Sequence, residues 1–348
     1  MEVFWLVIVV GMLIGYVVLD GFDFGVGMLY LLVARSDDER RTALASIGPI
    51  WSGNEVWLIA SGGLLFFAFP RAYAAGFSGF YLALIIVLWL FMLRGLALEL
   101  RSHMGHPIWT GFWDGALTVA SVLLSIVFGA ALGNLIRGVP LNANGYFFTA
   151  LWTDFTPGPQ PGILDWYTVL VAVTTAALLA LHGAYYLVMK TTGELATRSR
   201  TLATRLEWVA VPLFAITAGV SPWVQPTIVD GFAAHPIGLV FPALAVIALA
   251  GSLWAHHHGG ELVAFACSSG TLIAILASAA WGLFPNLLIS STDPAYSLTI
   301  YNAAASPHGL SIGLGWFTFG IALVVAYFLF VHRLFWGKVA SSAANSSH

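Results

Sequence analysis

Two carboxylates three residues apart, Asp20 and Asp23, lie in a stretch of sequence that is otherwise almost wholly apolar. The stretch runs from Phe4 to Leu32, and about 20 helical residues suffice to cross the hydrocarbon core of a bilayer. Residues three apart share one face of a helix. An ionisable group at that depth is costly unless it faces a partner, a cavity or water. The pair therefore predicts either a proton or ion path or a buried polar contact between helices.

More charged residues follow in the next two apolar stretches. Glu55 comes early in the first of them, and Arg94 and Glu99 come late in the second. Counted from the span ends, Asp23 lies near the middle of the membrane, and both glutamates lie near the edge where the first span ends. We predict that Asp20, Asp23, Glu55 and Glu99 form a file of acids that passes protons. The alternative is that Arg94 forms a static ion pair with Glu55 or an aspartate, which only joins helices.

The composition is that of a polytopic membrane protein. Of 348 residues, 59% are hydrophobic and 8% are charged, whereas soluble domains carry about 25% charged residues. The net charge of −3 gives no indication of nucleic-acid binding. With Cys267 as its single cysteine, the chain has no intrachain disulfide and no cysteine-based metal site.

Hydropathy and length predict an all-α integral membrane protein with nine transmembrane helices. The spans expected are 3–33, 52–69, 77–100, 112–133, 165–189, 206–222, 236–255, 262–284 and 308–335. The second and sixth are short. We predict one polytopic membrane domain over residues 1–340 and a disordered cytoplasmic tail over residues 341–348.

Basic residues are distributed unequally between the two sides of the predicted membrane. One side has only Arg71 and Arg137. The other side has Arg35, Arg40, Arg41, Arg101, Lys190, Arg198, Arg200, Arg205, Arg333 and Lys338. Because basic loops stay in the cytoplasm, we expect the N-terminus outside and the C-terminus inside. The loops 134–164 and 285–307 then lie outside, and Arg101 marks the cytoplasmic rim.

Histidine offers a different chemistry. His182 lies inside the fifth predicted span and is a candidate haem ligand. The run 256–258 falls in a cytoplasmic loop, where we expect solvated side chains.

Two other function classes fit the buried charges: a stand-alone proton-coupled transporter, which would work without a haem partner, and a purely structural anchor with all its charges paired.

Several motifs together carry a resemblance to a known family. They are LDGFDFGVGM at 19–28, WSGNEVWL at 51–58, the segment from Arg94 to Arg101, GNLIRGVP at 133–140, GAYYL with TGEL at 183–195, and FP with SLTI at 284–300. In this order, and over nearly the whole chain, they resemble subunit II of the cytochrome bd-type quinol oxidases. The resemblance implies two four-helix bundles plus one peripheral helix.

The resemblance also implies a function. The chain would pair with a haem-bearing subunit I that holds the quinol site and haem b with haem d, or b-type haems alone. The complex would oxidise quinol, reduce O2 to water and build a proton gradient without pumping, in the bacterial cytoplasmic membrane. This subunit would bind no haem itself, which argues against His182 as a ligand. It would support subunit I and supply part of the cytoplasmic proton path. A structural quinone and a small accessory subunit are compatible with this scheme.

One position departs from the family pattern. Members often carry an aspartate where this chain has Ser52, and that aspartate is a candidate channel entrance. We expect Glu55, one turn nearer the middle, to take over this role, with Ser52 as a hydroxyl relay. Asp20, Asp23 and Glu99 keep the types expected for the family, and we expect Arg94 to hold one of the acids ionised.

Overall fold

The structure, a computed structural model, describes residues 1–339, so the tail predicted over 341–348 lies outside the described residues. The chain is almost entirely helical, with one two-stranded antiparallel sheet of β1 (Asn286–Leu288) and β2 (Leu298–Thr299). The α-helices are α1 (Glu2–Val33), α2 (Asp37–Ile47), α3 (Trp51–Ala68), α4 (Pro70–Gly79), α5 (Tyr81–Leu100), α6 (Pro107–Arg137), α7 (Trp166–Lys190), α8 (Gly193–Val224), α9 (Thr227–Ala234), α10 (Val240–His257), α11 (Glu261–Leu283) and α12 (Pro307–Leu334). Short 3-10 helices cover Arg101–His103, Pro236–Leu239 and Pro294–Tyr296.

Within residues 1–339, eight helices are long and apolar enough to cross a membrane. They are α1, α5, α6, α7, α8, α10, α11 and α12, with α5 and α10 extended by their adjoining 3-10 turns. This confirms a mostly helical, multi-pass architecture. The second of the nine predicted spans corresponds to α3, which is 18 residues long and carries Asn54 and Glu55. These two polar side chains keep the hydropathy of its 18 residues below that of the most apolar 18-residue stretch in each of the other eight helices.

Two other predicted spans differ in extent from the helices observed. The span predicted at 206–222 is the apolar end of the 32-residue α8, whose first turns are rich in Arg and Thr and so escape a hydropathy window. The span predicted at 77–100 begins inside α4, and the chain bends at Phe80 before α5 starts. Hydropathy reports apolar length, and it is insensitive to both polar helical extensions and breaks.

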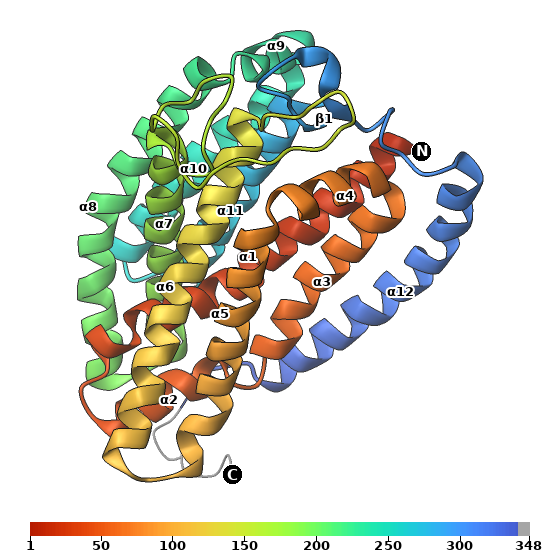
Figure 1. Cartoon of the computed structure of the whole chain (residues 1–348). Helices are drawn as coiled ribbons and strands as arrows, with labels where there is room; N and C mark the ends of the chain where they lie inside the picture. Colours follow the sequence, from red (N-terminus) through yellow and green to blue (C-terminus); the bar gives the residue numbers. More distant parts are fainter. Residues whose placement is uncertain (340–348) are drawn as a thin grey trace.

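Helix α1 is the centre of the molecule and packs against α3, α6 and α7 (Figure 1). Every residue from Asp20 to Tyr30 is buried. Gly25 on α1 and Gly183 on α7 allow the two backbones to touch, since a Cβ on either would overlap the other helix. Such small-residue contacts are typical of helix pairs in membranes.

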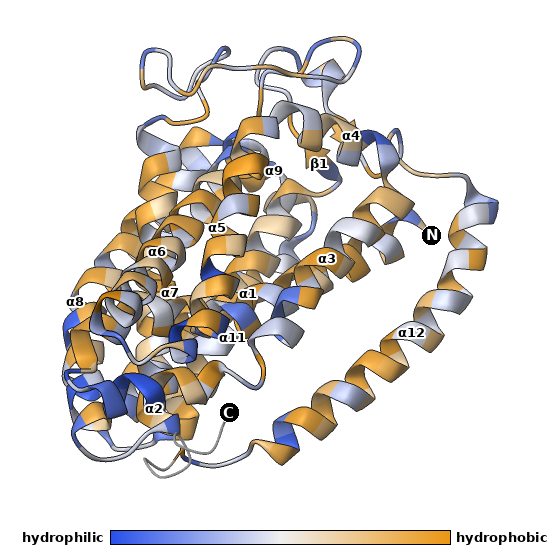
Figure 2. Cartoon of the chain, turned by 60° about the horizontal axis from the view of Figure 1, so that its bottom comes forward, coloured by the Kyte–Doolittle hydropathy of each residue, from blue (hydrophilic) through white to orange (hydrophobic). Residues whose placement is uncertain are grey.

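The N-terminus, β1, α9 and the loop that follows α6 lie at one end of the bundle, and α2 lies at the other (Figure 1). A bridge between Val139 and Ser290 joins the two long loops. Hydrophilic residues gather around α2, whereas the long helices are mainly hydrophobic (Figure 2). Helix α12 stands apart in both views, and large aromatic side chains bridge the space, with Phe328 5.2 Å from Trp57 between ring centroids.

Candidate functional site: a buried carboxyl cluster around Arg94

A buried arginine on α5 binds one of the predicted acids through two hydrogen bonds. Arg94 is 0% exposed. Its Nη2 donates to Asp20 Oδ1 at 2.6 Å, and its Nη1 donates to Asp20 Oδ2 at 3.1 Å. The guanidinium carbon also lies 4.5 Å from the centre of the Phe24 ring. Bidentate arginine–carboxylate pairs are among the strongest charge-assisted hydrogen bonds, so this pair ties α5 to α1.

Two further carboxyl groups meet the same guanidinium. Glu55 Oε1 accepts from Arg94 Nη1 at 2.9 Å. Asp23 Oδ2 lies 3.9 Å from Arg94 Nη2 and accepts from Asn54 Nδ2 at 2.8 Å. The two aspartates are 0% exposed, whereas the Glu55 side chain is 23% exposed. Three carboxyl groups therefore share one cation, and one of them reaches the surface of the subunit.

The local sequence explains how these side chains come together. The spacing of three places Asp20 and Asp23 on one face of α1, and α3 starts at Trp51, so Asn54 and Glu55 lie near its beginning. Asn54 is fully buried and also donates to the Leu19 carbonyl at 3.2 Å. We did not predict Asn54 as a site residue, although its position next to Glu55 in the WSGNEVWL motif is a usable signal.

The cluster contains polar atoms without a hydrogen-bond partner among the described residues. They include Asp23 Oδ1, Asn54 Oδ1, Arg94 Nε and the Tyr16 hydroxyl. Buried polar atoms are nearly always paired with protein or with ordered water. The cluster therefore has hydrogen-bonding capacity that its own side chains do not use.

Two predicted site residues lie outside this cluster. Ser52 on α3 and Glu99 on α5 occupy exposed positions, and within residues 1–339 neither side chain makes a hydrogen bond or an ion pair. Ser52 precedes Glu55 by three residues and so lies on the same face of α3. The structure thus brings together Asp20, Asp23, Glu55 and Arg94, and leaves Ser52 and Glu99 on the outer surface of the two helices.

Arg101 belongs to a separate cluster near the α2 end. It is 2% exposed and donates from Nε to Asp114 on α6 at 2.5 Å and from Nη2 to Asp37 on α2 at 2.8 Å. The Tyr30 hydroxyl also bonds to Asp114. Burial alone would raise the pKa of Asp37, but hydrogen bonds from Arg101 and Arg41 outweigh it, and the pKa lies below its usual value. Arg101 therefore locks α2 and α6 together and does not contact the predicted acids.

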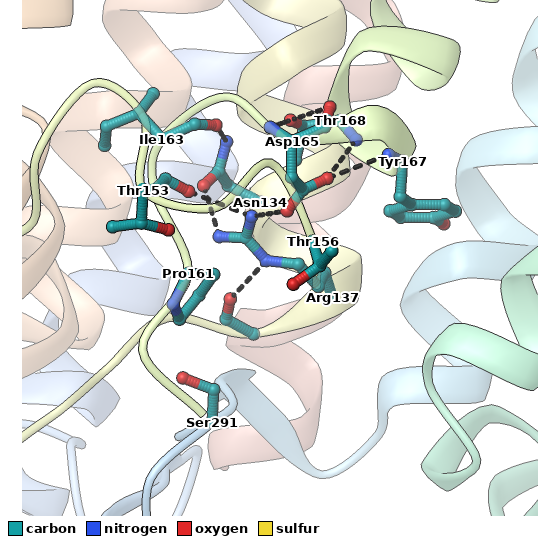
Figure 3. Close-up of polar contacts among 12 residues, drawn as sticks. Asn134, Arg137, Thr153, Thr156, Pro161, Ile163, Asp165, Tyr167, Thr168 and Ser291 are labelled. Carbon is teal, nitrogen blue, oxygen red and sulfur yellow. Dashed lines mark hydrogen bonds and ion pairs between the residues drawn. The ribbon is translucent and has the colours of Figure 1, made fainter. Parts of the chain in front are cut away.

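A third buried cation lies at the opposite end, where Arg137 is ion-paired with Asp165 (Figure 3). Arg137 Nη2 donates to Asn134 Oδ1 at 2.7 Å, and Nη1 donates to the Gly162 carbonyl at 3.0 Å. Asp165 Oδ1 in turn accepts from the first backbone N–H groups of α7. The sequence indicates only the side of the membrane on which Arg137 lies; the structure shows that Arg137 fixes the loop between α6 and α7.

The histidines differ from expectation in one respect. His182 Nδ1 lies 2.7 Å from Ser268 Oγ, and Nε2 donates to the Val18 carbonyl at 3.1 Å. Both ring nitrogens are engaged, so His182 does not fit the role of an axial haem ligand.

His256 differs from the prediction of a solvated loop position, because it is buried in the last turn of α10. There it lies 3.2 Å from Thr204 Oγ1, because α8 extends further than hydropathy indicated.

Comparisons with known proteins all indicate the same protein family. The sequence profile described as "Cytochrome bd terminal oxidase subunit II" matches residues 1–335. The chain is 34% identical to "Cytochrome bd-I ubiquinol oxidase subunit 2" of Escherichia coli (strain K12), covering 96% of this chain and 93% of the relative. It is 30% identical to "Cytochrome bd ubiquinol oxidase subunit 2" of Bacillus subtilis (strain 168), covering 88% of each.

A solved structure has a similar fold. A chain in "The structure of bd oxidase from Geobacillus thermodenitrificans" superposes with a TM-score of 0.72 at 16% identity, covering 96% of this chain and 98% of that one. The profile spans nearly every described residue, and two curated relatives reach 30% identity or more over most of their length. The chain therefore belongs to the cytochrome bd terminal oxidase subunit II family.

Proposed function

We propose that this chain is the non-haem subunit of a quinol:oxygen oxidoreductase and that its carboxyl cluster carries protons toward the haem-bearing subunit I. The observation that carries the proposal is the sharing of one guanidinium by three carboxyl groups. Arg94 can neutralise one carboxylate. The remaining two must bind protons or leave net charge in a water-poor interior, which costs several kcal/mol per ion. Groups that hold protons in this way can also exchange them.

The geometry supports an order for the path. Glu55 is the partly exposed member and the entrance, and Asp20 and Asp23 are the buried members. Asn54 orients Asp23 through its amide. Arg94 is the charge partner of Asp20, because both carboxylate oxygens accept from it. The unpartnered oxygens of Asp23 and Asn54 suit water molecules that would bridge the steps.

The exposed face of α3 and α5 is the surface we assign to subunit I. It includes Ser52, Glu99 and the open side of Glu55, with large apolar side chains such as Ile59 and Trp89. Acidic side chains that face lipid are disfavoured, so this face is better covered by protein. In this arrangement the proton path opens at the seam between subunits, with Glu99 and Ser52 near its mouth.

The proposed topology has nine spans, with the N-terminus outside and the C-terminus in the cytoplasm. Helix α3, the second span in chain order, completes the nine together with the eight apolar helices. It begins near α2 and ends where the Ala68 carbonyl accepts from Ala305 N at 2.9 Å, just before α12. Eighteen residues extend about 27 Å, close to the thickness of the hydrocarbon core. The two four-helix bundles with one peripheral helix remain part of this proposal.

The oxygen chemistry belongs to subunit I, whose haems would supply electron transfer and O2 reduction. This chain contributes a frame and a proton route, and we assign no haem or quinol site to its described residues. A co-purification experiment tests this division of labour. The chain purified in mild detergent should bring a second large membrane subunit, b- or d-type haem bands in a reduced-minus-oxidised spectrum, and quinol-dependent oxygen uptake. A colourless single-chain preparation would contradict it.

The proton-path role is tested by Asp23→Asn. The variant keeps the size of the side chain and its contact with Asn54 but removes the exchangeable proton, so quinol-driven oxygen uptake should fall at least about tenfold, equivalent to about 1.4 kcal/mol of barrier. Haem content and subunit assembly should stay close to wild type. The matched control is Asp230→Asn, at an exposed aspartate on α9. If Asp23→Asn abolishes assembly and leaves the turnover of the assembled fraction unchanged, the cluster is structural.

A further inference from the structure

A cavity of about 350 Å³ lies near the α2 end of the molecule, away from the carboxyl cluster's polar contacts. Its walls come from α1, α2 and the linker after α2, from α7 and α11, and from the end of α12 with the segment that follows it. The walls are mainly apolar, and they include Phe22, Ile50, Met189 and Phe265. A cavity of about 150 Å³ in a protein core suffices to hold benzene, so this space is large enough for a substantial apolar group.

The cavity is deep enough for a chain that crosses one leaflet of a bilayer. It reaches from Lys190, at the end of α7, inward to Val18 on α1. Val18 lies 15 residues before the end of α1 at Val33, which corresponds to about 22 Å along that helix. Half of a bilayer's hydrocarbon core is about 15 Å thick. The cavity is therefore deeper than the hydrocarbon of one leaflet, and an extended apolar chain that enters at the helix ends could cross one leaflet within it.

The mouth of the cavity carries more positive than negative charge. Lys190 Nζ donates to the carbonyls of Phe335 and Gly337 at 2.8 and 3.0 Å, and among the described residues it has no carboxylate partner. Lys338 pairs with Glu261 at 2.6 Å, but the same glutamate also pairs with Arg200 at 2.7 Å. Two cations thus share one carboxylate, and Lys190 adds a third positive charge nearby. This imbalance favours an anionic group at the mouth.

We propose that this cavity binds an anionic phospholipid, with an acyl chain between α1, α7 and α11 and the phosphate beside Lys190 and Lys338. Basic pockets between transmembrane helices on the cytoplasmic side are suited to anionic headgroups, and the apolar walls are suited to an acyl chain. A neutral quinone would fill the apolar part but would leave the cations unmatched. The lipid would fasten the segment after α12, whose backbone already meets Lys190, to the body of the subunit. This goes beyond the proposed proton path and does not depend on it.

Two tryptophans allow a direct test on the assembled oxidase complex. Trp336 lines the cavity, whereas Trp316 lies in the N-terminal half of α12, away from the cavity. The side chain of each is 75% exposed. The complex is reconstituted in phosphatidylcholine nanodiscs that contain a small fraction of phosphatidylglycerol with brominated chains, and the emission of each tryptophan is isolated by difference from its Trp→Phe variant. Brominated phosphatidylcholine at the same fraction is the comparison.

We expect brominated phosphatidylglycerol to quench Trp336 severalfold more than brominated phosphatidylcholine does, with no such preference at Trp316. The double variant Lys190→Gln/Lys338→Gln should lose the preference, while oxygen uptake per haem persists. Equal quenching of Trp336 by both lipids would overturn the proposal in favour of ordinary surrounding lipid. Relief of the quenching by added quinone, but not by unlabelled phosphatidylglycerol, would overturn it in favour of a quinone.

Discussion

At the scale of single residues, Arg94 decides what the carboxyl cluster can do. It contacts Asp20, Asp23 and Glu55 within 4.0 Å, so its charge sets how many of them can be ionised together. Removal of one partner of a buried ion pair is far more destructive than replacement of both, because the remaining charge is left without compensation. The structural and the proton-carrying roles therefore coexist in the same side chains, and suitable variants separate them.

The prediction at this scale concerns Arg94→Gln. The variant leaves Asp20 buried without a cation and should destabilise the subunit by about 3–5 kcal/mol. The double variant Arg94→Gln/Asp20→Asn should recover part of this loss, since it removes both charges. Thermal unfolding of the purified complex measures the effect. A double variant whose loss equals the sum of the two single losses would show that the pair is not energetically coupled.

At the scale of helices and loops, the sequence predicts where a residue lies along its helix better than which way it faces. The spacing of Asp20 and Asp23 and the early position of Glu55 in its span correctly indicated side chains that meet. Ser52 and Glu99 lie in the expected helices but occupy exposed positions. Helices α3 and α5 are apolar on nearly all sides, so hydropathy carries little information about their rotation.

Contacts between distant segments were also not predictable from one sequence. The partners of Arg101 are Asp37 and Asp114, which lie on other elements, and no local pattern joins them. In helix α3, by contrast, a local pattern was informative. Its hydropathy is lower than that of the most apolar stretches of the other long helices because it carries Asn54 and Glu55. The weakest predicted span is weak because it holds candidate functional residues.

The contact between α1 and α7 gives a prediction for Gly25→Ala. The added methyl group would overlap the backbone at Leu179 and Gly183, so the helices must separate, and the subunit should lose about 1–3 kcal/mol of stability. Gly11→Ala, in the same helix, is the matched control because nothing lies within 4 Å of the added Cβ. Thermal unfolding of both complexes compares them. Equal stabilities would show that close backbone contact is unimportant here.

A pH prediction concerns the attachment of α2. Burial would raise the pKa of Glu39, but hydrogen bonds from Arg198 and from the backbone of Arg35 and Ser36 lower it below its usual value. A lowered folded-state pKa stabilises the protein above the unfolded-state pKa of about 4.3, and this contribution disappears as the pH falls through the lower, folded-state value.

The measurement is the thermal unfolding midpoint of wild type and Arg198→Gln as a function of pH. The difference between the two midpoints should be largest near pH 7 and should decrease below about pH 4. Arg205→Gln, at an exposed position on the same helix, is the control and should show a small gap at all pH values. A gap for Arg198→Gln that stays constant through the acid range would mean that the ion pair with Glu39 contributes nothing.

At the scale of the whole molecule, the chain has charged clusters at three levels. Arg137 fixes the loops at the end with the N-terminus, Arg94 lies among the helices, and Arg101 fixes the end with α2. The outer two have their charges matched by tight local partners, and only the middle one has more carboxyl groups than cations. This contrast is why we assign proton transfer to the Arg94 cluster and structural roles to the other two.

The most direct measurement is time-resolved proton uptake by the reduced complex after an O2 pulse, followed with a pH indicator on the cytoplasmic side of proteoliposomes. Wild type and Asp23→Asn are compared, together with the rate at which quinol reduces the haems. We predict that Asp23→Asn leaves haem reduction unchanged and slows proton uptake and oxygen consumption in parallel. Proton uptake at the wild-type rate in a fully assembled Asp23→Asn complex would contradict the assignment of the proton path to this cluster.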